Sequence, residues 1–265
     1  MDWSKIKTIF ILTFLALDIY LLYEFFKIRD ASKYDFITET SFEEHLAQDE
    51  IEYVELPKNV DKDTYVSAKP KIFKKEDYAK VKGVNYTIVD GAVLLGVFDE
   101  PVSLKDLQKT DLNAFVANKI LFGDQYKYFS QNKEDHTITF FQQFKNETIY
   151  NNINGKLTLH VNDKNEIYSF TQTLLEEIEL LQEEHDVLPP LKAIETLYDN
   201  GILEPRSKIT KVELGLHTLV QLTASQLLTP TWHFVVDDKE NLYVNAFEGQ
   251  IIEIEDTKEK INGVN

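Results

Sequence analysis

The sequence predicts an α+β protein: one N-terminal transmembrane helix, then an ectodomain of antiparallel sheets with a few packed helices. Three observations predict it. Residues 8–26 form a single long apolar run. Beyond residue 36, short β-rich stretches alternate with turn-forming residues, a pattern typical of antiparallel strands joined by tight turns. Only a few stretches between them have helical periodicity, so helices are a minor part of the expected ectodomain.

The apolar run Thr8–Phe26 lies between Lys7 and Lys27 and contains nineteen residues. As a helix it is about 28 Å long, close to the thickness of a bilayer's hydrocarbon core. A cleaved signal peptide has a shorter apolar stretch and a small-x-small cleavage site, whereas this run ends in two phenylalanines and a lysine. We therefore expect an uncleaved anchor and localisation to the cell membrane as a single-pass protein.

Lysines and arginines flank the run on both sides, so local charge does not decide its orientation. The segment before it is short and has no folded mass, which favours a cytoplasmic N-terminus and an extracellular C-terminal domain. The expected organisation is a cytoplasmic tail at 1–7, the membrane helix at 8–26 and an extended juxtamembrane linker at 27–36. The ectodomain would then comprise an N-terminal part at 37–102 and two further segments at 103–185 and 186–265.

Asp18 lies near the middle of the expected span, where an ionised aspartate costs about 2.5–3.5 kcal/mol. Two interpretations stay open: the side chain contacts a polar group on another membrane helix, or it is protonated and merely tolerated. Because residues three, four and seven apart share a helix face, the candidate partner-binding face contains Ile11, Phe14, Leu15, Asp18, Leu22 and Phe25.

The ectodomain pattern predicts particular elements. Ser41 and Glu44 resemble a capping box for a helix at 42–48, and Asp90-Gly91 supplies the turn of a hairpin at Val84–Phe98. Further helices are expected at 103–122 and, after Pro189-Pro190, at 191–200. Strands are expected at 126–130, 137–144, 156–162, 208–219, 231–237, 242–246 and 251–255. The stretch 167–175 is expected to begin as a strand. Residues 174–184 are rich in helix formers, so whether they form a helix or a strand is left open.

Two stretches of the ectodomain align without a gap, Val161–Tyr168 and Val236–Tyr243. Each follows an expected helix and at least one strand. The likeness suggests two related helix-plus-meander units at 103–185 and 186–265, although a shared hairpin turn explains so short a match equally well.

Composition excludes several functions. The 265 residues are 43% hydrophobic, enough for a core, and the formal charge of −17 disfavours nucleic acid and anionic lipid surfaces as partners of the ectodomain. The absence of cysteine removes disulfides, thiolate metal sites and cysteine nucleophiles.

The sequence contains no recognisable catalytic, cofactor or metal motif. None of the six histidines forms a close ligand pair: His45, His136, His160, His185, His217 and His233. The acidic clusters Asp61–Asp63, Asn162-Asp163 and Asp237-Asp238 lack the ligand spacing of an EF-hand and are better explained as turns. We expect no catalytic residue, no metal and no cofactor.

The opening Met1-Asp-Trp-Ser-Lys-Ile-Lys and the apolar run after it resemble the N-terminus of the YycI (WalI) family. The segments Pro230-Thr-Trp232-His-Phe and Tyr243-Val-Asn-Ala-Phe-Glu-Gly249 are similar to that family as well, and also to PepSY-type modules. The resemblance implies a non-catalytic regulator of the WalK–WalR two-component system, which controls cell-wall metabolism in low-GC Gram-positive bacteria.

The resemblance further implies two partners: the sensor histidine kinase WalK, through the membrane helix, and the related protein YycH, through the ectodomain. It does not show whether the kinase is restrained or activated. Two other functional classes stay open, a membrane-tethered envelope hydrolase and a PepSY-like inhibitor or chaperone of exported proteins.

Overall fold

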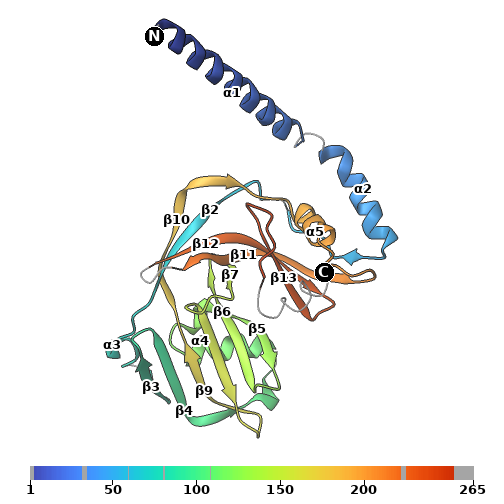
Figure 1. Cartoon of the computed structure of the whole chain (residues 1–265). Helices are drawn as coiled ribbons and strands as arrows, with labels where there is room; N and C mark the ends of the chain where they lie inside the picture. The colour runs from blue at the N-terminus through green and yellow to red at the C-terminus, as the bar shows by residue number, and fades with distance from the viewer. Residues whose placement is uncertain are drawn as a thin grey trace. The chain divides into compact units, whose positions relative to one another are not determined.

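The computed structural model describes residues 3–31, 35–58, 60–79, 81–107, 109–221 and 225–253. The chain forms two compact units. One comprises Met1–Glu52 with Glu204–Ser207, and the other comprises Tyr53–Leu203 with Lys208–Asn265. The α+β class is confirmed, because the second unit is built on a large, mostly antiparallel sheet with a few helices (Figure 1).

The first unit begins with two helices, α1 (Trp3–Ala31) and α2 (Asp35–Gln48). The stretch at 27–36 was expected to be extended, but its described residues, 27–31 and 35–36, are helical and belong to α1 and α2. The expected helix at 42–48 is the C-terminal half of α2. In the described residues, no helix combines the length and the hydropathy required to cross a membrane.

Apolar and polar contacts complete the first unit. Phe42 and Leu46 of α2 are buried. The amide of Arg206 donates a hydrogen bond to the carbonyl of Asp49 (2.8 Å), and its guanidinium pairs with Glu50 (3.0 Å). The segment Glu204–Ser207, distant in sequence, is therefore tied to the end of α2.

The large sheet of the second unit has two parts, which are called sheet A and sheet B. Sheet A has the order β10 (Leu175–Asp186), β2 (Lys62–Pro70), β12 (Gln226–Val236), β11 (Lys208–Gln221), and β13 (Glu240–Asn245) also pairs with β12. Sheet B has the order β6 (Thr137–Phe144), β8 (Lys156–Val161), β9 (Glu166–Gln172), β4 (Val93–Ser103), β3 (Val84–Val89), with β5 (Tyr126–Asn132) beside β6. The short strand β7 (Glu147–Tyr150) joins the sheets, pairing in parallel with β11 and antiparallel with β6. A two-residue strand, β1 (Glu52–Tyr53), precedes β2.

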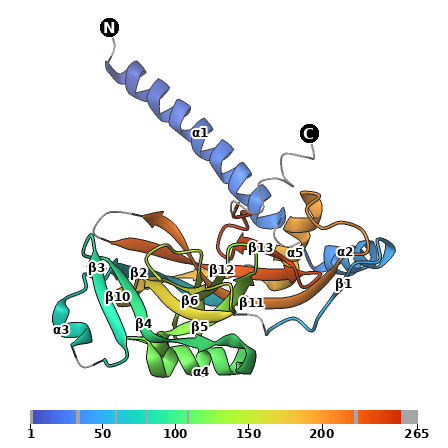
Figure 2. The same ribbon diagram turned by 90° about the horizontal axis from the view of Figure 1, so that it is seen from below.

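One face of sheet B carries a hydrophobic core. Its strands alternate between buried and outward-facing residues, as a sheet with one covered face requires. The helix α4 (Lys109–Lys119) packs on the buried face (Figure 2). Central members of this core are Leu94, Phe98, Val116, Ile138, Phe140, Leu157, Leu159 and Phe170.

Sheet A carries a smaller core of its own, which includes Val66, Ile149, Leu216 and Leu228. The helix α5 (Pro190–Asp199) begins with a proline at its first turn, and Gly201 follows it in a left-handed conformation (φ +68°). Before the helix, the carbonyl of Leu188 accepts a hydrogen bond from the buried indole of Trp232 (2.7 Å). Three further helical turns are α3 (Lys75–Tyr78), η1 (Leu104–Asp106) and η2 (Gly123–Gln125).

Most of the expected elements are present. The hairpin at Val84–Phe98 is β3 and β4, and its turn residues Asp90 and Gly91 both have positive φ, as that turn chemistry requires. The expected helix at 103–122 is instead the short turn η1 followed by α4. The stretch whose type was left open is strand from residue 175, as part of β10. The strand expected at 251–255 is a single bridge between Ile251 and Val244, and residues from 254 lie outside the described part.

The two aligned stretches form the β8–β9 and β12–β13 hairpins, but their turns differ. In the first, Asn165 has positive φ, and the Asn162 side chain accepts hydrogen bonds from the amides of Lys164 and Glu166. In the second, Asp237 and Asp238 have positive φ. The acidic residues at both sites are turn residues, as expected. The two-unit repeat stays a prediction.

Candidate functional site

The candidate partner face of the N-terminal helix lies on α1. Ile11, Phe14, Leu15 and Leu22 are all more than half exposed, and Asp18 is exposed among them. Their spacing puts them on one side of the helix. The side chain of Phe25 lies outside the described residues. Whether this face binds a partner stays a prediction.

A second candidate site is a cleft of about 510 Å³ in the second unit, which the sequence did not predict. Its lining comes from β5, β7, β11, β12 and β13. Tyr150 and His233 are almost fully buried in it, with 1% and 2% of their surface exposed. The other side chains of the lining include Lys127, Phe129, Thr148, Lys211, Glu213, Asp238, Lys239 and Asn241.

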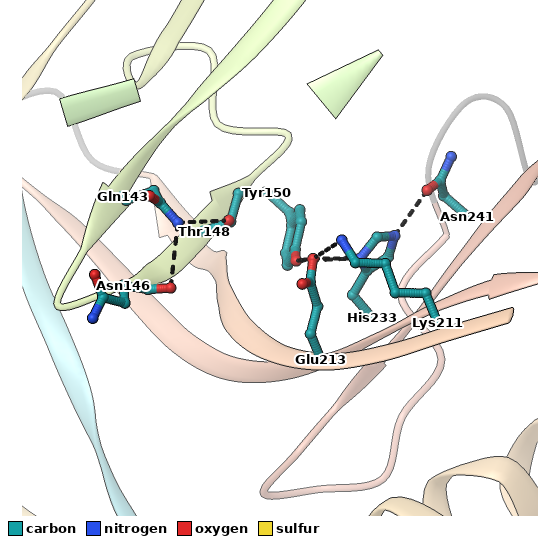
Figure 3. Close-up of polar contacts among 8 residues, drawn as sticks. All are labelled: Gln143, Asn146, Thr148, Tyr150, Lys211, Glu213, His233 and Asn241. Atoms are coloured by element: carbon teal, nitrogen blue, oxygen red, sulfur yellow. Dashed lines mark hydrogen bonds and ion pairs between the residues drawn. The ribbon is translucent and has the colours of Figure 1, made fainter. Parts of the chain in front are cut away.

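A polar network around one carboxylate oxygen joins five of the lining residues, Tyr150, Lys211, Glu213, His233 and Asn241 (Figure 3). Glu213 Oε1 accepts hydrogen bonds from the Tyr150 hydroxyl (2.5 Å) and from Lys211 Nζ (2.7 Å), and it lies 3.4 Å from His233 Nδ1. The same His233 nitrogen is 3.2 Å from the Tyr150 hydroxyl. On the other side of the ring, Nε2 is 2.8 Å from Asn241 Oδ1. One carboxylate thus holds three side chains from three strands.

Strand register explains how distant residues meet here. Glu213 on β11 lies directly opposite His233 on β12, which in turn lies opposite Tyr243 on β13, and the last two rings stack at 4.9 Å. Tyr150 arrives from β7 through the parallel β7–β11 pairing. Gly215 leaves room for it, since a Cβ atom there would stand 2.5 Å from the Tyr150 ring.

The electrostatics favour an ionised Glu213. Burial alone would raise its pKa, but the hydrogen bonds from His233, Lys211 and Tyr150 together hold the pKa well below the usual range. For Tyr150, burial and then the neighbouring Glu213 charge raise the pKa of the phenol. At neutral pH the network therefore contains a carboxylate and a neutral phenol.

This arrangement is poorly suited to acid–base catalysis. A general base needs a free lone pair within reach of a substrate proton. The Glu213 oxygen already has three partners, and both His233 nitrogens face groups of the protein. Within the described residues, no group of three or more His, Asp or Glu side chains is placed to hold a metal ion. The network is best understood as a polar brace between β7, β11 and β12.

The other histidines that the sequence draws attention to occupy separate places. His185 packs against Tyr65 and Phe247, with ring centroids 5.0 and 5.2 Å away. His160 lies 3.1 Å from the Thr171 hydroxyl on the outer face of sheet B. The structure does not bring them into the cleft with His233.

Glu147, on the joining strand β7, has an unusual carboxyl group. Burial, reinforced by the negative charge of Asp63, raises its pKa to about 7, while Lys145 partly opposes the shift. A raised pKa means that the native state binds the proton more tightly than the unfolded state. The stability that this proton contributes is fully present below pH 4.5 and is lost as the pH rises through about 7.

We therefore expect Glu147→Gln to stabilise the protein at pH 8 by about 1–2 kcal/mol, with partial solvent screening included. The difference from the parent should vanish below pH 4.5. Thermal unfolding between pH 4 and pH 8 measures it. Glu100→Gln, at an exposed position, should change the melting temperature little at either pH. A Glu147→Gln variant that is less stable than the parent at pH 8 would contradict the raised pKa of Glu147.

Residues 31–247 match the model of a protein family described as "YycI protein". The chain belongs to the YycI family. The match covers most of the chain and starts at the end of α1, so it includes both sheets and the cleft. No curated protein sequence matches the chain significantly.

Solved structures that are similar to this chain include the following three. An uncharacterized protein from Eubacterium rectale has a TM-score of 0.46 at 9% identity, covering 78% of this chain and 92% of its own. The C-terminal domain of YpeB from Bacillus megaterium has a TM-score of 0.39 at 10% identity, covering 72% and 88%. YycH from Bacillus subtilis has a TM-score of 0.39 at 14% identity, covering 76% of this chain and 54% of its own.

Proposed function

We propose that this YycI-family protein is a non-catalytic, membrane-anchored regulator of a sensor histidine kinase that controls cell-wall metabolism. The family match over residues 31–247 carries the proposal. The kinase that the family resemblance implies is WalK. Both His233 nitrogens and Glu213 Oε1 have polar partners within the protein, which favours this function over an envelope hydrolase, since a hydrolase would need a free base in its cleft.

In this proposal α1 is the anchor, with its N-terminus in the cytoplasm and the second unit outside the cell. The support is the apolar run of the sequence at 8–26 and the exposed apolar side chains of α1. Phe10, Ile11, Leu12 and Ile19 are each about 60% exposed, which is unfavourable in water but favourable in lipid. The anchor would stay attached, because no small-x-small site follows the apolar run.

The topology predicts a simple result. Protease added to intact protoplasts should digest the sheet-containing unit and leave a fragment that corresponds to the anchor. An N-terminal epitope should survive until the membrane is permeabilised. A mature protein that begins near residue 30, or a unit that resists digestion in intact protoplasts, would contradict the topology.

The regulatory contact is proposed to use the helix face around Asp18. A polar group buried in lipid gains from a polar partner on another helix, an interaction typically worth about 0.6 kcal/mol and at most about 2. Asp18 is exposed on α1 and is flanked by apolar residues on the same side, so it is available to such a partner.

We therefore expect Asp18→Leu to insert normally but to recover about two- to tenfold less kinase on co-purification from native membranes. Transcription of the kinase's regulon should shift while the abundance of the protein is unchanged. Tyr20→Leu is the matched control, since Tyr20 is exposed on the opposite side of α1. Equal kinase recovery and unchanged regulon output for Asp18→Leu would mean that the aspartate is only tolerated.

A further inference from the structure

The cleft beside the Glu213 network concentrates positive charge in a chain that is otherwise strongly acidic. Three lysines line it: Lys127 on β5, Lys211 on β11 and Lys239 in the turn between β12 and β13. Two carboxylates, Glu213 and Asp238, line the same cleft, so lysines outnumber acids there, whereas the whole chain has 45 Asp and Glu against 28 Lys and Arg. Such a local reversal of charge attracts an anion that the rest of the surface repels.

Two of the three lysines are available to a ligand. Lys211 Nζ is 2.7 Å from Glu213 Oε1 and is held by that ion pair. Within the described part of the chain, no carboxylate pairs with Lys127 or Lys239, and both residues are exposed. An ammonium group donates hydrogen bonds and accepts none, so both lysines can bind the oxygens of a carboxylate or phosphate group.

The cleft also offers one free acceptor. The Glu213 side chain is 27% exposed, and its Oε1 atom is the oxygen that accepts from Tyr150 and Lys211. No donor among the described residues reaches its second oxygen, Oε2. The depressed pKa makes this carboxylate a weak base, but it remains a strong hydrogen-bond acceptor. A ligand must therefore supply a donor at Oε2.

A hydroxyl group suits this position better than an ammonium group. A second ammonium group at Oε2 would lie close to that of Lys211, and the two positive charges would repel each other. A hydroxyl group donates the same hydrogen bond without a charge. A fully ionised inorganic anion has no proton to donate, so the ligand must carry hydroxyl groups as well as its anionic group.

Rigid side chains complete the lining. The half-buried Phe129 ring lies against Phe141 and Tyr150, with ring centroids 4.7 and 6.2 Å away, so it presents a fixed apolar surface. Asn241 Oδ1 is 2.8 Å from His233 Nε2, and the Asn241 amide nitrogen points away from that ring (Figure 3). An apolar wall with a few fixed polar groups is typical of small-ligand sites, whose volumes are about 300–1,000 Å³, and this cleft has about 510 Å³.

We propose that this cleft binds an anionic monosaccharide, a sugar that carries a carboxylate or a phosphate group. The anionic group pairs with Lys127 and Lys239, a sugar hydroxyl donates to Glu213 Oε2, and the apolar face of the sugar ring packs on Phe129. The site uses no residue of α1, so the inference goes beyond the proposed regulatory function and does not depend on it.

Isothermal titration calorimetry of the full-length chain in mild detergent tests the ligand class. Glucuronate and glucose 6-phosphate are the anionic probes, whereas glucose and inorganic phosphate each lack one half of the required chemistry. At least one anionic sugar should bind about tenfold more tightly than glucose and than inorganic phosphate, because it makes both the ion pairs and the hydroxyl contact. The tighter of the two distinguishes a carboxylate from a phosphate ligand. Binding of neither anionic sugar at about 10 mM, or equal binding of glucose or inorganic phosphate, would overturn the proposal.

Single lysine variants test whether the binding occurs in this cleft. Lys127→Met and Lys239→Met keep an unbranched side chain but remove the charge, so each should weaken binding about tenfold while the melting temperature stays unchanged. Lys164→Met, at an exposed position in the turn between β8 and β9, makes the same change in net charge and should bind the sugar like the parent. Unchanged affinity in both cleft variants, or an equal loss of affinity in Lys164→Met, would also overturn the proposal.

Discussion

Replacing Glu213 with alanine is expected to lower the free energy of unfolding by about 2–3 kcal/mol at pH 7. The substitution removes the shared acceptor of Tyr150 and Lys211 and leaves the almost fully buried Tyr150 hydroxyl without its carboxylate. For a chain of this size the melting temperature should fall by about 4–12 °C. Thermal unfolding of the full chain in mild detergent measures the change.

The pH dependence distinguishes this loss from a general packing defect. Glu213 has a depressed pKa in the folded state, so its stabilisation is present above the unfolded value near 4.5 and is lost as the pH falls below it. The gap between parent and variant should therefore shrink at pH 3–4. Glu213→Gln, which keeps an oxygen acceptor, should cost less than alanine. A gap that is equally large at both pH values would contradict the ionised network.

Replacing Gly96 with alanine should destabilise the protein at least as much as Glu213→Ala does. The expected decrease in the free energy of unfolding is about 3 kcal/mol. A Cβ atom at this position of β4 would stand 2.2–2.8 Å from three ring atoms of Phe170, which is 1% exposed in the core of sheet B. The ring covers the glycine on the neighbouring strand, and close packing around it leaves little room to move. Denaturant unfolding of the variant measures the loss.

Two comparisons make the interpretation specific. Gly155→Ala should cost less than about 1 kcal/mol, because its Cβ atom would meet the nearest side-chain atoms at 3.4 Å. Phe170→Leu in the Gly96→Ala background should recover part of the lost stability by removing ring atoms from the clash. If Gly96→Ala is as stable as the parent, the ring does not lie over the glycine.

The sequence was sufficient to predict the structure where a few adjacent residues determine the backbone conformation. Asp90 and Gly91 specify the β3–β4 turn, and the proline before α5 with Gly201 after it specifies that helix. The two hairpins with similar sequences were also located correctly, although their turns place the left-handed residues differently. These features depend on contacts within a few residues, which a sequence displays directly.

Pairing between strands that are distant in sequence determines the elements whose type was left open or that were not predicted. Residues 174–184 are rich in glutamate and leucine, which favour helices, yet β10 pairs with β2 and its glutamates meet lysines there. Glu176 and Glu177 form ion pairs with Lys71 and Lys69. Such pairing outweighs the small free-energy differences of helix propensity. The joining strand β7 has only four residues and no local pattern that distinguishes it from a loop.

The cleft could not be predicted because its residues are remote in sequence. Tyr150 and Glu213 are 63 positions apart, and Glu213 and His233 are 20 apart. The alternation of Lys211 and Glu213 within an expected strand shows only that they share a face. Their meeting with Tyr150 depends on the parallel β7–β11 pairing, and β7 itself was not expected.

The central claim is that this chain regulates a sensor histidine kinase through the Asp18 face of α1. The most direct measurement is photo-crosslinking in native membranes, with a photoreactive amino acid in place of Leu15 or Leu22 on that face and of Tyr20 on the opposite side of the helix. We expect the Leu15 and Leu22 probes to capture the kinase and the Tyr20 probe to capture much less of it. Equal capture from both sides, or capture of lipid and unrelated proteins alone, would contradict it.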